Sequence, residues 1–467
     1  MSTSKLPTRL NLSFDVELAL AGSLPVTWGQ QAIWDAMRDL GKHDHQFNLH
    51  WVLTLPTPRP ACQVLTALAW LVDRHESLRS VFGDGHDGTA TQRLLERCEI
   101  PLEWRAGGGG AGDTGRAAGL AEELCARRFQ HHEEPPLRVG LLHVGGDVTH
   151  VVLAVSHMTA DNDGLVRAAG ELLDRIQGRD SRSPEPTQPR EIAALQMSEP
   201  WQARSGRAIE YWRNILRAAP PMETPPDIAD ERSPRFWRGS LRSCALPGAV
   251  GELAQAGGVS TTSVLLAAAS SVLGTLTGSS RPCLMLMCNN RTREPFRSAI
   301  SPVALEGIVS FDVSSISYRD GSDAMGAGGD FGAVVRRAWN ASLLAYRYAQ
   351  YDKTALLRGI AQAGGTRSSM HRTCWFNDLR FDRRPQLPRE DAGDPERGEF
   401  SWRGFTHEQG DADLAFHIYD HEDALQVTLT ADTRVVGPRT IERALHTMER
   451  MITDAAVAAR AVEGVHD

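Results

Sequence analysis

The chain has 467 residues, of which 41% are hydrophobic and 23% are charged, and its formal net charge is -8 at pH 7. These proportions are ordinary for a globular protein, and the length predicts two lobes because it is too great for a single hydrophobic core. The acidic balance excludes a general electrostatic attraction for nucleic acid or anionic lipid.

The cysteines and the apolar segments indicate the compartment. The seven cysteines are scattered and form no CxxC pair, which argues against a disulfide framework and fits a reducing cytoplasm. The first fifteen residues lack the apolar core of a signal peptide. The longest apolar run, 261–277, is interrupted by Ser, Thr and Gly, so it predicts a buried helix and not a membrane span. We therefore expect a cytoplasmic protein that does not enter the membrane.

The first third of the chain predicts alternating helices and strands. Apolar residues at helical spacing predict a helix over 28–40, and a β-rich run predicts a strand over 50–55. A Gly-rich stretch, 105–116, lacks the ending of a phosphate-binding loop and is interpreted as a flexible surface turn. Further helices are expected over 61–74, 117–129 and 165–176, and further strands over 138–143 and 148–155.

A polar stretch with three prolines, 177–190, predicts a linker. The expected organisation is therefore an N-terminal lobe over 1–176 and a C-terminal lobe over 191–467. In the second lobe, helices are expected over 204–217, 250–256, 261–277 and 439–459, and strands over 283–288 and 424–429.

The segment 151–164 is the best candidate for chemistry. A buried strand ends, His157 follows it, a carboxylate comes four residues later at Asp161, and Gly164 precedes a helix. A histidine at the end of a strand can be held rigidly, face a cleft and exchange a proton near neutral pH. A histidine in the core that is satisfied by a backbone carbonyl fits the same segment, so the segment alone leaves both interpretations open.

Several short motifs follow one another along the chain. They lie at 27–34 (TWGQQAIW), 74–82 (RHESLRSVF), 136–142 (PLRVGLL), 156–161 (SHMTAD), 210–213 (EYWR), 290–291 (NR) and 306–311 (EGIVSF). In sequence and in order, this series resembles the motifs of the condensation domains of nonribosomal peptide synthetases, a branch of the chloramphenicol acetyltransferase-like superfamily. The resemblance implies an α/β fold with two chloramphenicol acetyltransferase-like lobes, arranged as a V around a central tunnel that reaches His157.

The resemblance also assigns roles to individual residues. His157 matches the motif histidine that deprotonates or positions the acceptor nucleophile, and Asp161 matches a structural aspartate that pairs with an arginine of the other lobe, for which Arg291 is the candidate. Ser156 stands where the family has a first histidine. Asn162 stands where it has glycine, with Gly164 two residues later; because asparagine also tolerates left-handed backbone angles, we expect the turn to survive this replacement.

The function implied is that of a free-standing condensation enzyme in secondary-metabolite biosynthesis. It would join a carrier-bound acyl or aminoacyl thioester to the amine, or the hydroxyl, of a small-molecule acceptor. We expect no bound cofactor and no metal, with the phosphopantetheine arm of an acyl or peptidyl carrier protein, acting in trans, as the substrate carrier. A monomer is expected, with no nucleic-acid or membrane partner.

Two alternative functions stay open. The first is an acyl-CoA-dependent acyltransferase of the same fold. The second is a non-catalytic module that recruits a carrier, which the departures at Ser156 and Asn162 keep in view.

Two other candidate sites are set aside. The run 131–134 (HHEE) is interpreted as a solvated loop. Cys374 is interpreted as part of a buried strand and not as a nucleophile.

Overall fold

The computed structural model describes residues 6–14, 22–85, 88–179, 185–219, 233–315, 330–362, 374–380, 399–407, 413–421 and 423–463. The chain divides into two compact units, each described by itself. In the described part of the chain, unit 1 contains the residues up to Ala203 together with Asn289–Ala304. Unit 2 contains Arg204–Cys288 and the described residues from Leu305 onward.

Unit 1 is built on a five-stranded sheet in the order β1-β6-β7-β8-β3, in which only the β6–β7 pair is parallel. Its strands are β1 (Arg9–Ser13), β6 (Arg97–Ala106), β7 (Leu137–Val144), β8 (Asp147–Val155) and β3 (Leu49–Pro60). A smaller sheet pairs β2 (Leu24–Pro25), β5 (Ala90–Leu94) and β4 (Ser80–Asp84). The helices are α1 (Trp28–Leu40), η2 (Gly41–Phe47), α2 (Ala61–Arg74), η3 (Glu76–Arg79), α3 (Gly112–Cys125), α4 (Asn162–Ile176) and α5 (Pro189–Met197).

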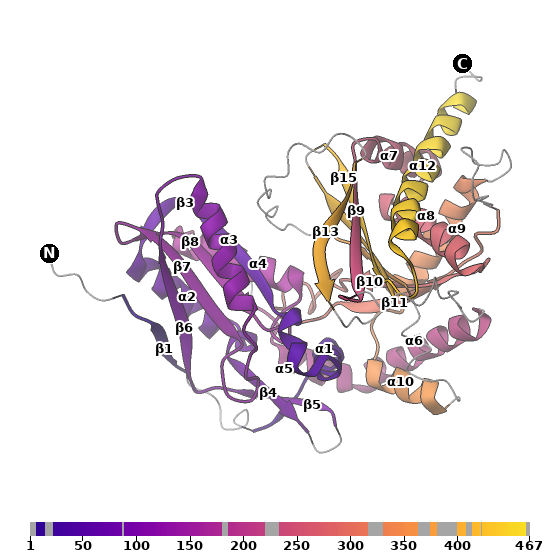
Figure 1. Cartoon of the computed structure of the whole chain (residues 1–467). Coiled ribbons are helices and arrows are strands. Elements are labelled where there is room, and N and C mark those ends of the chain that lie inside the picture. Colours follow the sequence, from indigo (N-terminus) through magenta and orange to yellow (C-terminus); the bar gives the residue numbers. More distant parts are fainter. Residues whose placement is uncertain are drawn as a thin grey trace. The chain divides into compact units, whose positions relative to one another are not determined.

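Helices cover both faces of the five-stranded sheet. Val151, Leu153 and Val155 of β8 pack in one core cluster with α2 and α4, whereas Val152 and Ala154 pack in another with α3. Successive side chains of a strand point to opposite faces, so β8 is buried on both sides and reads as a continuous apolar run. Figure 1 shows α3 running across one face of these strands. The residue that follows β8 is therefore placed by a rigid central strand.

Unit 2 is built on a seven-stranded sheet in the order β11-β10-β12-β14-β15-β9-β13. Its strands are β9 (Phe236–Ser243), β10 (Cys283–Cys288), β11 (Leu305–Ser310), β12 (Cys374–Asp378), β13 (Glu399–His407), β14 (Leu414–Asp420) and β15 (Leu425–Asp432). Its helices are α6 (Glu199–Ala218), which begins in unit 1, α7 (Leu246–Gly257), α8 (Thr261–Thr277), α9 (Phe331–Arg347), α10 (Lys353–Gln362) and α12 (Pro438–Glu463). The helix α8 is buried from Thr262 to Gly274, as the sequence predicts.

No single helix in the described ranges is long and apolar enough to cross a bilayer. Together, α7 and α8 have the length and apolar composition of a membrane span, but the chain bends by 105° between the two helices.

The α/β class is confirmed, and three helices, over 28–40, 61–74 and 261–277, have the predicted bounds. The flexible turn predicted over 105–116 is wrong in part, because α3 already begins at Gly112. The carboxylate of Asp113 accepts hydrogen bonds from the backbone N–H groups of Gly108 and Gly109 and so orders this glycine-rich stretch. The arrangement of the lobes as a V with a tunnel stays a prediction.

The observed division of the chain also differs from the predicted lobes. Residues 191–203 and 289–304 cluster with unit 1, although the predicted boundaries assign them to the second lobe. The end of the predicted linker is anchored to unit 1, since the Gln188 side chain donates to the carbonyl of Arg74 and Arg190 pairs with Glu76. Of the predicted linker, residues 180–184 lie outside the described residues.

Candidate active site

The candidate site is a tight turn between β8 and α4. The backbone N–H of Ser156 donates to the carbonyl of Pro136, and that of Thr159 donates to the carbonyl of Ser156. Ser156 is fully buried, and its Oγ accepts a hydrogen bond from the N–H of Met158, 3.2 Å away. The serine side chain thus satisfies a backbone donor inside the turn, and this fixes the two residues on either side of His157.

His157 is half-buried, and its Nδ1 lies 2.9 Å from the carbonyl oxygen of Ala160. A carbonyl oxygen only accepts, so Nδ1 carries the proton, and in the neutral ring the lone pair then resides on Nε2. The two interpretations left open by the sequence are compatible, because a single carbonyl contact both satisfies the ring and selects the tautomer with a basic Nε2.

Asp161 is the N-cap of α4, and its carboxylate accepts hydrogen bonds at both oxygens. Oδ1 accepts from the N–H of Gly164 at 2.9 Å and from Nη2 of Arg291 at 2.6 Å. Oδ2 accepts from the N–H groups of Val303 and Ala304 at 3.0 and 3.1 Å. The carboxylate therefore joins the start of α4 to the segment 289–304.

The charge of Asp161 is stabilised in spite of its burial. Burial alone would raise the pKa of this carboxyl group. The Arg291 guanidinium and the N–H donors of Val303 and Gly164 outweigh burial and hold the pKa below its ordinary value of 3.8. Asp161 is therefore an anion at neutral pH, suited to hold a cation and not to exchange a proton.

Arg291 organises the segment that carries it. Nη1 donates to the carbonyls of Phe296 and Ala299, and Nη2 donates to the carbonyl of Ser301 as well as to Asp161. The structure thus brings together the two residues that the sequence paired. It places Arg291 in unit 1, although the residue was expected in the other lobe.

The turn forms with asparagine at position 162, and Asn162 does not use left-handed backbone angles. Asn162 is the first residue of α4, and Asn290 is the only non-glycine residue in the described ranges with a positive φ. Gly164 is not left-handed either, but a Cβ atom on it would lie 3.2 Å from Nη2 of Arg291 and from Oδ1 of Asp161. The glycine is therefore explained by the close approach of the guanidinium and not by backbone conformation.

Residues that the sequence did not assign a role also contact this turn. The Nε2 of Gln30 donates to the carbonyl of Met158 at 3.1 Å, and the ring of Phe47 lies beside that of His157. Gln30 lies in the motif at 27–34, and this motif was the signal in the sequence that could have identified its role. Nothing in the sequence around Phe47 indicated this contact.

The candidates set aside have different outcomes. His131 is buried and lies edge-on to Trp34, so the solvated-loop interpretation is wrong for this residue; burial lowers its pKa to about 4 although the Asp44 carboxylate is close. Cys374 is fully buried in β12, as predicted, and burial raises the pKa of its thiol. Among the described residues, no group of three or more His, Cys, Asp and Glu side chains is placed to hold a metal ion.

A family model described as the condensation domain matches residues 21–461 of the chain. Among curated proteins, the chain is 30% identical over 233 residues to the probable non-canonical nonribosomal peptide synthetase CymA of Salinispora arenicola (strain CNS-205), covering 47% of the chain and 3% of CymA. It is also 30% identical over 239 residues to the phosphinothricin tripeptide synthetase PhsC of Streptomyces viridochromogenes, covering 48% of the chain and 21% of PhsC. The matches therefore cover only a small part of these relatives.

Solved structures show the same fold. The crystal structure of the X-domain from teicoplanin biosynthesis matches with a TM-score of 0.68 and 19% identity, over 93% of this chain and 95% of that one.

Proposed function

Because the chain belongs to the condensation-domain family, we propose that it joins an acyl or aminoacyl group, held as a thioester on a carrier protein, to an amine or hydroxyl acceptor. The product is an amide or an ester in the biosynthesis of a secondary metabolite. The phosphopantetheine arm of the carrier delivers the thioester as a substrate. His157 is the catalytic residue in this proposal.

The observation that carries the proposal is the geometry of His157. Its Nδ1 is bonded to the carbonyl of Ala160, so Nε2 has the lone pair that accepts a hydrogen bond from the attacking N–H or O–H group. The carbon–sulfur bond of the thioester breaks as the carbon–nitrogen or carbon–oxygen bond forms, and the acceptor's proton leaves with the carrier thiol. A thioester is already activated, so alignment and the exclusion of water supply most of the rate enhancement.

Ser156, Asp161, Gly164 and Arg291 support the catalytic residue in this proposal without touching the reacting atoms. Ser156 and Ala160 hold the turn, and the buried pair of Asp161 and Arg291 fixes the start of α4 directly after it. Asn162 is the first residue of that helix and needs no special backbone angle.

The test is condensation on carrier proteins encoded beside this gene, each carrying phosphopantetheine loaded with an acyl or aminoacyl group and mixed with candidate amines. Intact-mass measurement follows the loss of the acyl group from the carrier and the appearance of the product. We expect wild-type protein to form product and His157→Ala to lose at least about 100-fold in rate, the usual contribution of a positioned acid–base group.

His150→Ala is the matched control. His150 is a buried histidine within β8, the strand that precedes His157, and its Nδ1 is hydrogen-bonded to the Thr149 hydroxyl. It lies five residues before the end of β8, about 17 Å along the strand at the usual rise per residue, so this variant should keep its activity. If the enzyme used free acyl-CoA as fast as the loaded carrier, acyl-CoA would replace the carrier-bound thioester as the donor in the proposal. Product formation unaffected by His157→Ala, or no product with a carrier that binds, would favour the recruiting module.

A further inference from the structure

The ring of Phe47 lies beside the imidazole of His157. The two ring centroids are 6.0 Å apart and the ring planes are inclined by 45°. Phe47 is half-buried and packs on a cluster that includes Trp34 and Met158, the residue after His157. The Nδ1 hydrogen bond thus holds one edge of the imidazole, with the phenyl ring as its aromatic neighbour.

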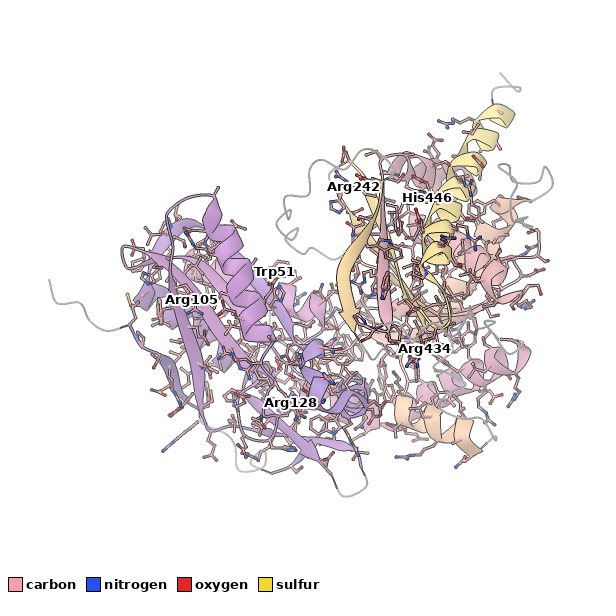
Figure 2. The ribbon with its side chains drawn as sticks, viewed as in Figure 1. Trp51, Arg105, Arg128, Arg242, Arg434 and His446 are labelled. Atoms are coloured by element: carbon pink, nitrogen blue, oxygen red, sulfur yellow. The ribbon has the colours of Figure 1, made fainter. Side chains whose placement is uncertain are left out.

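The position of Phe47 is fixed from both sides. It is the last residue of η2, and within η2 the buried Asp44 accepts hydrogen bonds from Nε of Arg128 at both carboxylate oxygens, at 2.9 and 2.8 Å. The next residue, Asn48, donates from Nδ2 to the carbonyls of Cys125 and Arg127 at 2.9 and 3.0 Å. Both anchors lie at the end of α3 and in the turn that follows it, in which Arg128 is labelled in Figure 2.

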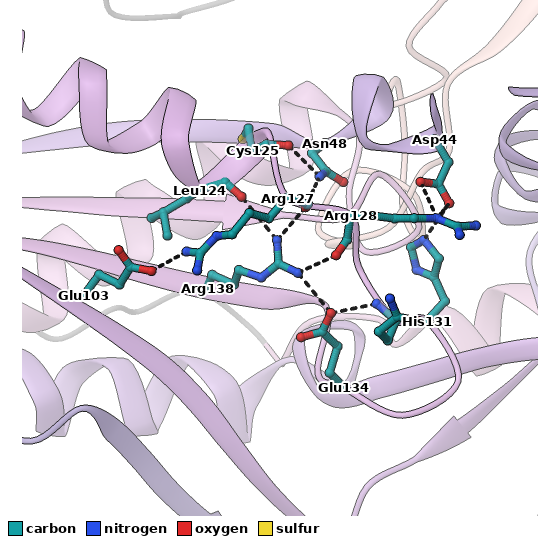
Figure 3. Close-up of polar contacts among 11 residues, drawn as sticks. Asp44, Asn48, Glu103, Leu124, Cys125, Arg127, Arg128, His131, Glu134 and Arg138 are labelled. Carbon is teal, nitrogen blue, oxygen red and sulfur yellow. Dashed lines mark hydrogen bonds and ion pairs between the residues drawn. The ribbon is translucent and has the colours of Figure 1, made fainter. Parts of the chain in front are cut away.

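The turn after α3 is itself held in place by Arg138 of β7 (Figure 3). Its Nη1 donates to the carbonyls of Leu124 and Arg127, and its Nη2 donates to the carbonyl of Arg128 and to Oε1 of Glu134. β7 pairs directly with β8, which ends at Val155, two residues before His157. The same sheet therefore supports the histidine through the turn after β8 and, through Arg138 and the turn after α3, the aromatic ring beside it.

We propose that Phe47 is a positioning residue for His157, and that the contacts of Asp44 with Arg128 and of Asn48 with the turn hold Phe47 in place. The inference deepens the proposed function, because it concerns the residue that the function makes catalytic. Phe47 keeps the imidazole bonded to Ala160 through Nδ1 and thereby keeps the lone pair on Nε2 directed along one line. A purely structural phenylalanine would contribute to folding and leave the tautomer of His157 unchanged.

The first measurement needs no substrate. Protein labelled with ¹⁵N-histidine gives two-bond nitrogen–proton spectra in which the His157 signals are identified by their loss in His157→Ala. The wild-type protein should show mostly the tautomer protonated at Nδ1. In Phe47→Leu, the ratio of the two tautomers should fall about five- to tenfold, the factor expected if one ordinary hydrogen bond is lost. Phe47→Tyr, which keeps the ring, should restore the wild-type ratio.

Phe14→Leu is the control for the loss of a half-buried ring. Phe14 is also in unit 1 but lies against Arg79, with the guanidinium carbon 4.4 Å from the ring centroid. Its replacement should lower the melting temperature and leave the His157 tautomer ratio unchanged. The same ratio in Phe47→Leu and wild type would overturn the proposal, whatever the effect on stability.

Asp44→Asn tests the anchor. We expect a shift of the tautomer ratio in the same direction as for Phe47→Leu, with no further shift when the two changes are combined. Glu123→Gln, which breaks the exposed pair with Arg105, is the matched control and should have no effect. Full additivity of Asp44→Asn and Phe47→Leu would contradict the anchoring role.

With a carrier and acceptor that the wild-type enzyme uses, Phe47→Leu should reduce kcat about tenfold and change the KM for the acceptor less than twofold. An unchanged kcat would argue against positioning. If no condensation activity is found for the wild type, the proposed function fails, while the tautomer measurement still decides the role of Phe47.

Discussion

Asp161 and Arg291 form a buried ion pair in which Oδ1 and Nη2 are 2.6 Å apart and both side chains are less than one-tenth exposed. The two residues are 130 positions apart in the chain. The guanidinium also binds three backbone carbonyls of its own segment, and the carboxylate binds three backbone N–H groups. Each charge is therefore the centre of a set of backbone contacts and not only the partner of the other charge.

We expect Asp161→Asn to lower the free energy of unfolding by about 3–5 kcal/mol, because a buried guanidinium loses its counter-charge. Urea denaturation followed by tryptophan fluorescence measures this loss. Glu99→Gln, which breaks the exposed pair with Arg9, is the control and should cost less than about 1 kcal/mol. Similar losses in the two variants would show that the buried pair contributes no more than a surface contact.

The contribution of Asp161 should depend on pH in a defined direction. Burial would raise the pKa of this carboxyl group, but Arg291 and the N–H donors hold it below 3.8 in the folded state. Its stabilisation is therefore complete above pH 3.8 and is lost as the pH falls through the folded value. The difference in unfolding free energy between wild type and Asp161→Asn should be constant near neutral pH and shrink below pH 4. A difference that widens on acidification would reverse this sign and contradict the lowered pKa.

Two glycines of the same helix, α4, should respond to alanine in opposite ways. At Gly164 the new Cβ atom would lie 3.2 Å from both Asp161 and Arg291, which hydrogen bonds hold in place, so we expect a loss of about 1–2 kcal/mol. At Gly170 a Cβ atom meets nothing within 4 Å, so alanine should stabilise the helix by about 0.5–1 kcal/mol. Thermal unfolding of both variants tests the contrast, which would fail if the two shifts had the same sign.

Replacing Gly29 by alanine should cost more stability than the same change at a helical glycine that has open space around it. A Cβ atom there would lie 2.1 Å from the carbonyl oxygen of Pro302, next to the N–H groups that bind Asp161. Gly29→Ala therefore has to separate α1 from this segment, and we expect a loss of at least about 2 kcal/mol. Gly119→Ala in α3, where nothing lies within 4 Å, is the control and should be neutral or stabilising in the same denaturation assay.

The sequence predicted the elements whose cause is local. The apolar spacing of 28–40 and 61–74 and the apolar run 261–277 reproduce the bounds of α1, α2 and α8, because such patterns are readable within one segment. The motif at 156–161 located the turn after β8 for the same reason. The start of α3 at Gly112 was not predicted, because it depends on hydrogen bonds from the N–H groups of Gly108 and Gly109 to the carboxylate of Asp113. The glycines by themselves suggest a mobile turn.

Contacts between distant segments were predicted only where a motif supplied them. The family resemblance paired Arg291 with Asp161. It did not predict that Arg291 belongs to unit 1, because this assignment depends on hydrogen bonds to the carbonyls of Phe296, Ala299 and Ser301. The ring of Phe47 reaches His157 through a network of side chains and carbonyls in the turn after α3. Neither hydrophobic periodicity nor residue type encodes such a network.

The departure of Ser156 from the family's histidine is open to a direct test in both directions. Ser156→Ala leaves the buried N–H of Met158 without the Oγ acceptor that lies 3.2 Å away, so we expect a loss of about 1–3 kcal/mol of stability. Ser156→His restores the family residue at a fully buried position, where the larger ring has to displace packed neighbours, so it should destabilise the protein and not raise condensation activity. Unfolding free energies and condensation rates of both variants, measured beside wild type, separate the two effects. A Ser156→His variant that is as stable as wild type and more active would mean that the serine is a loss of function and not an alternative way of closing the turn around His157.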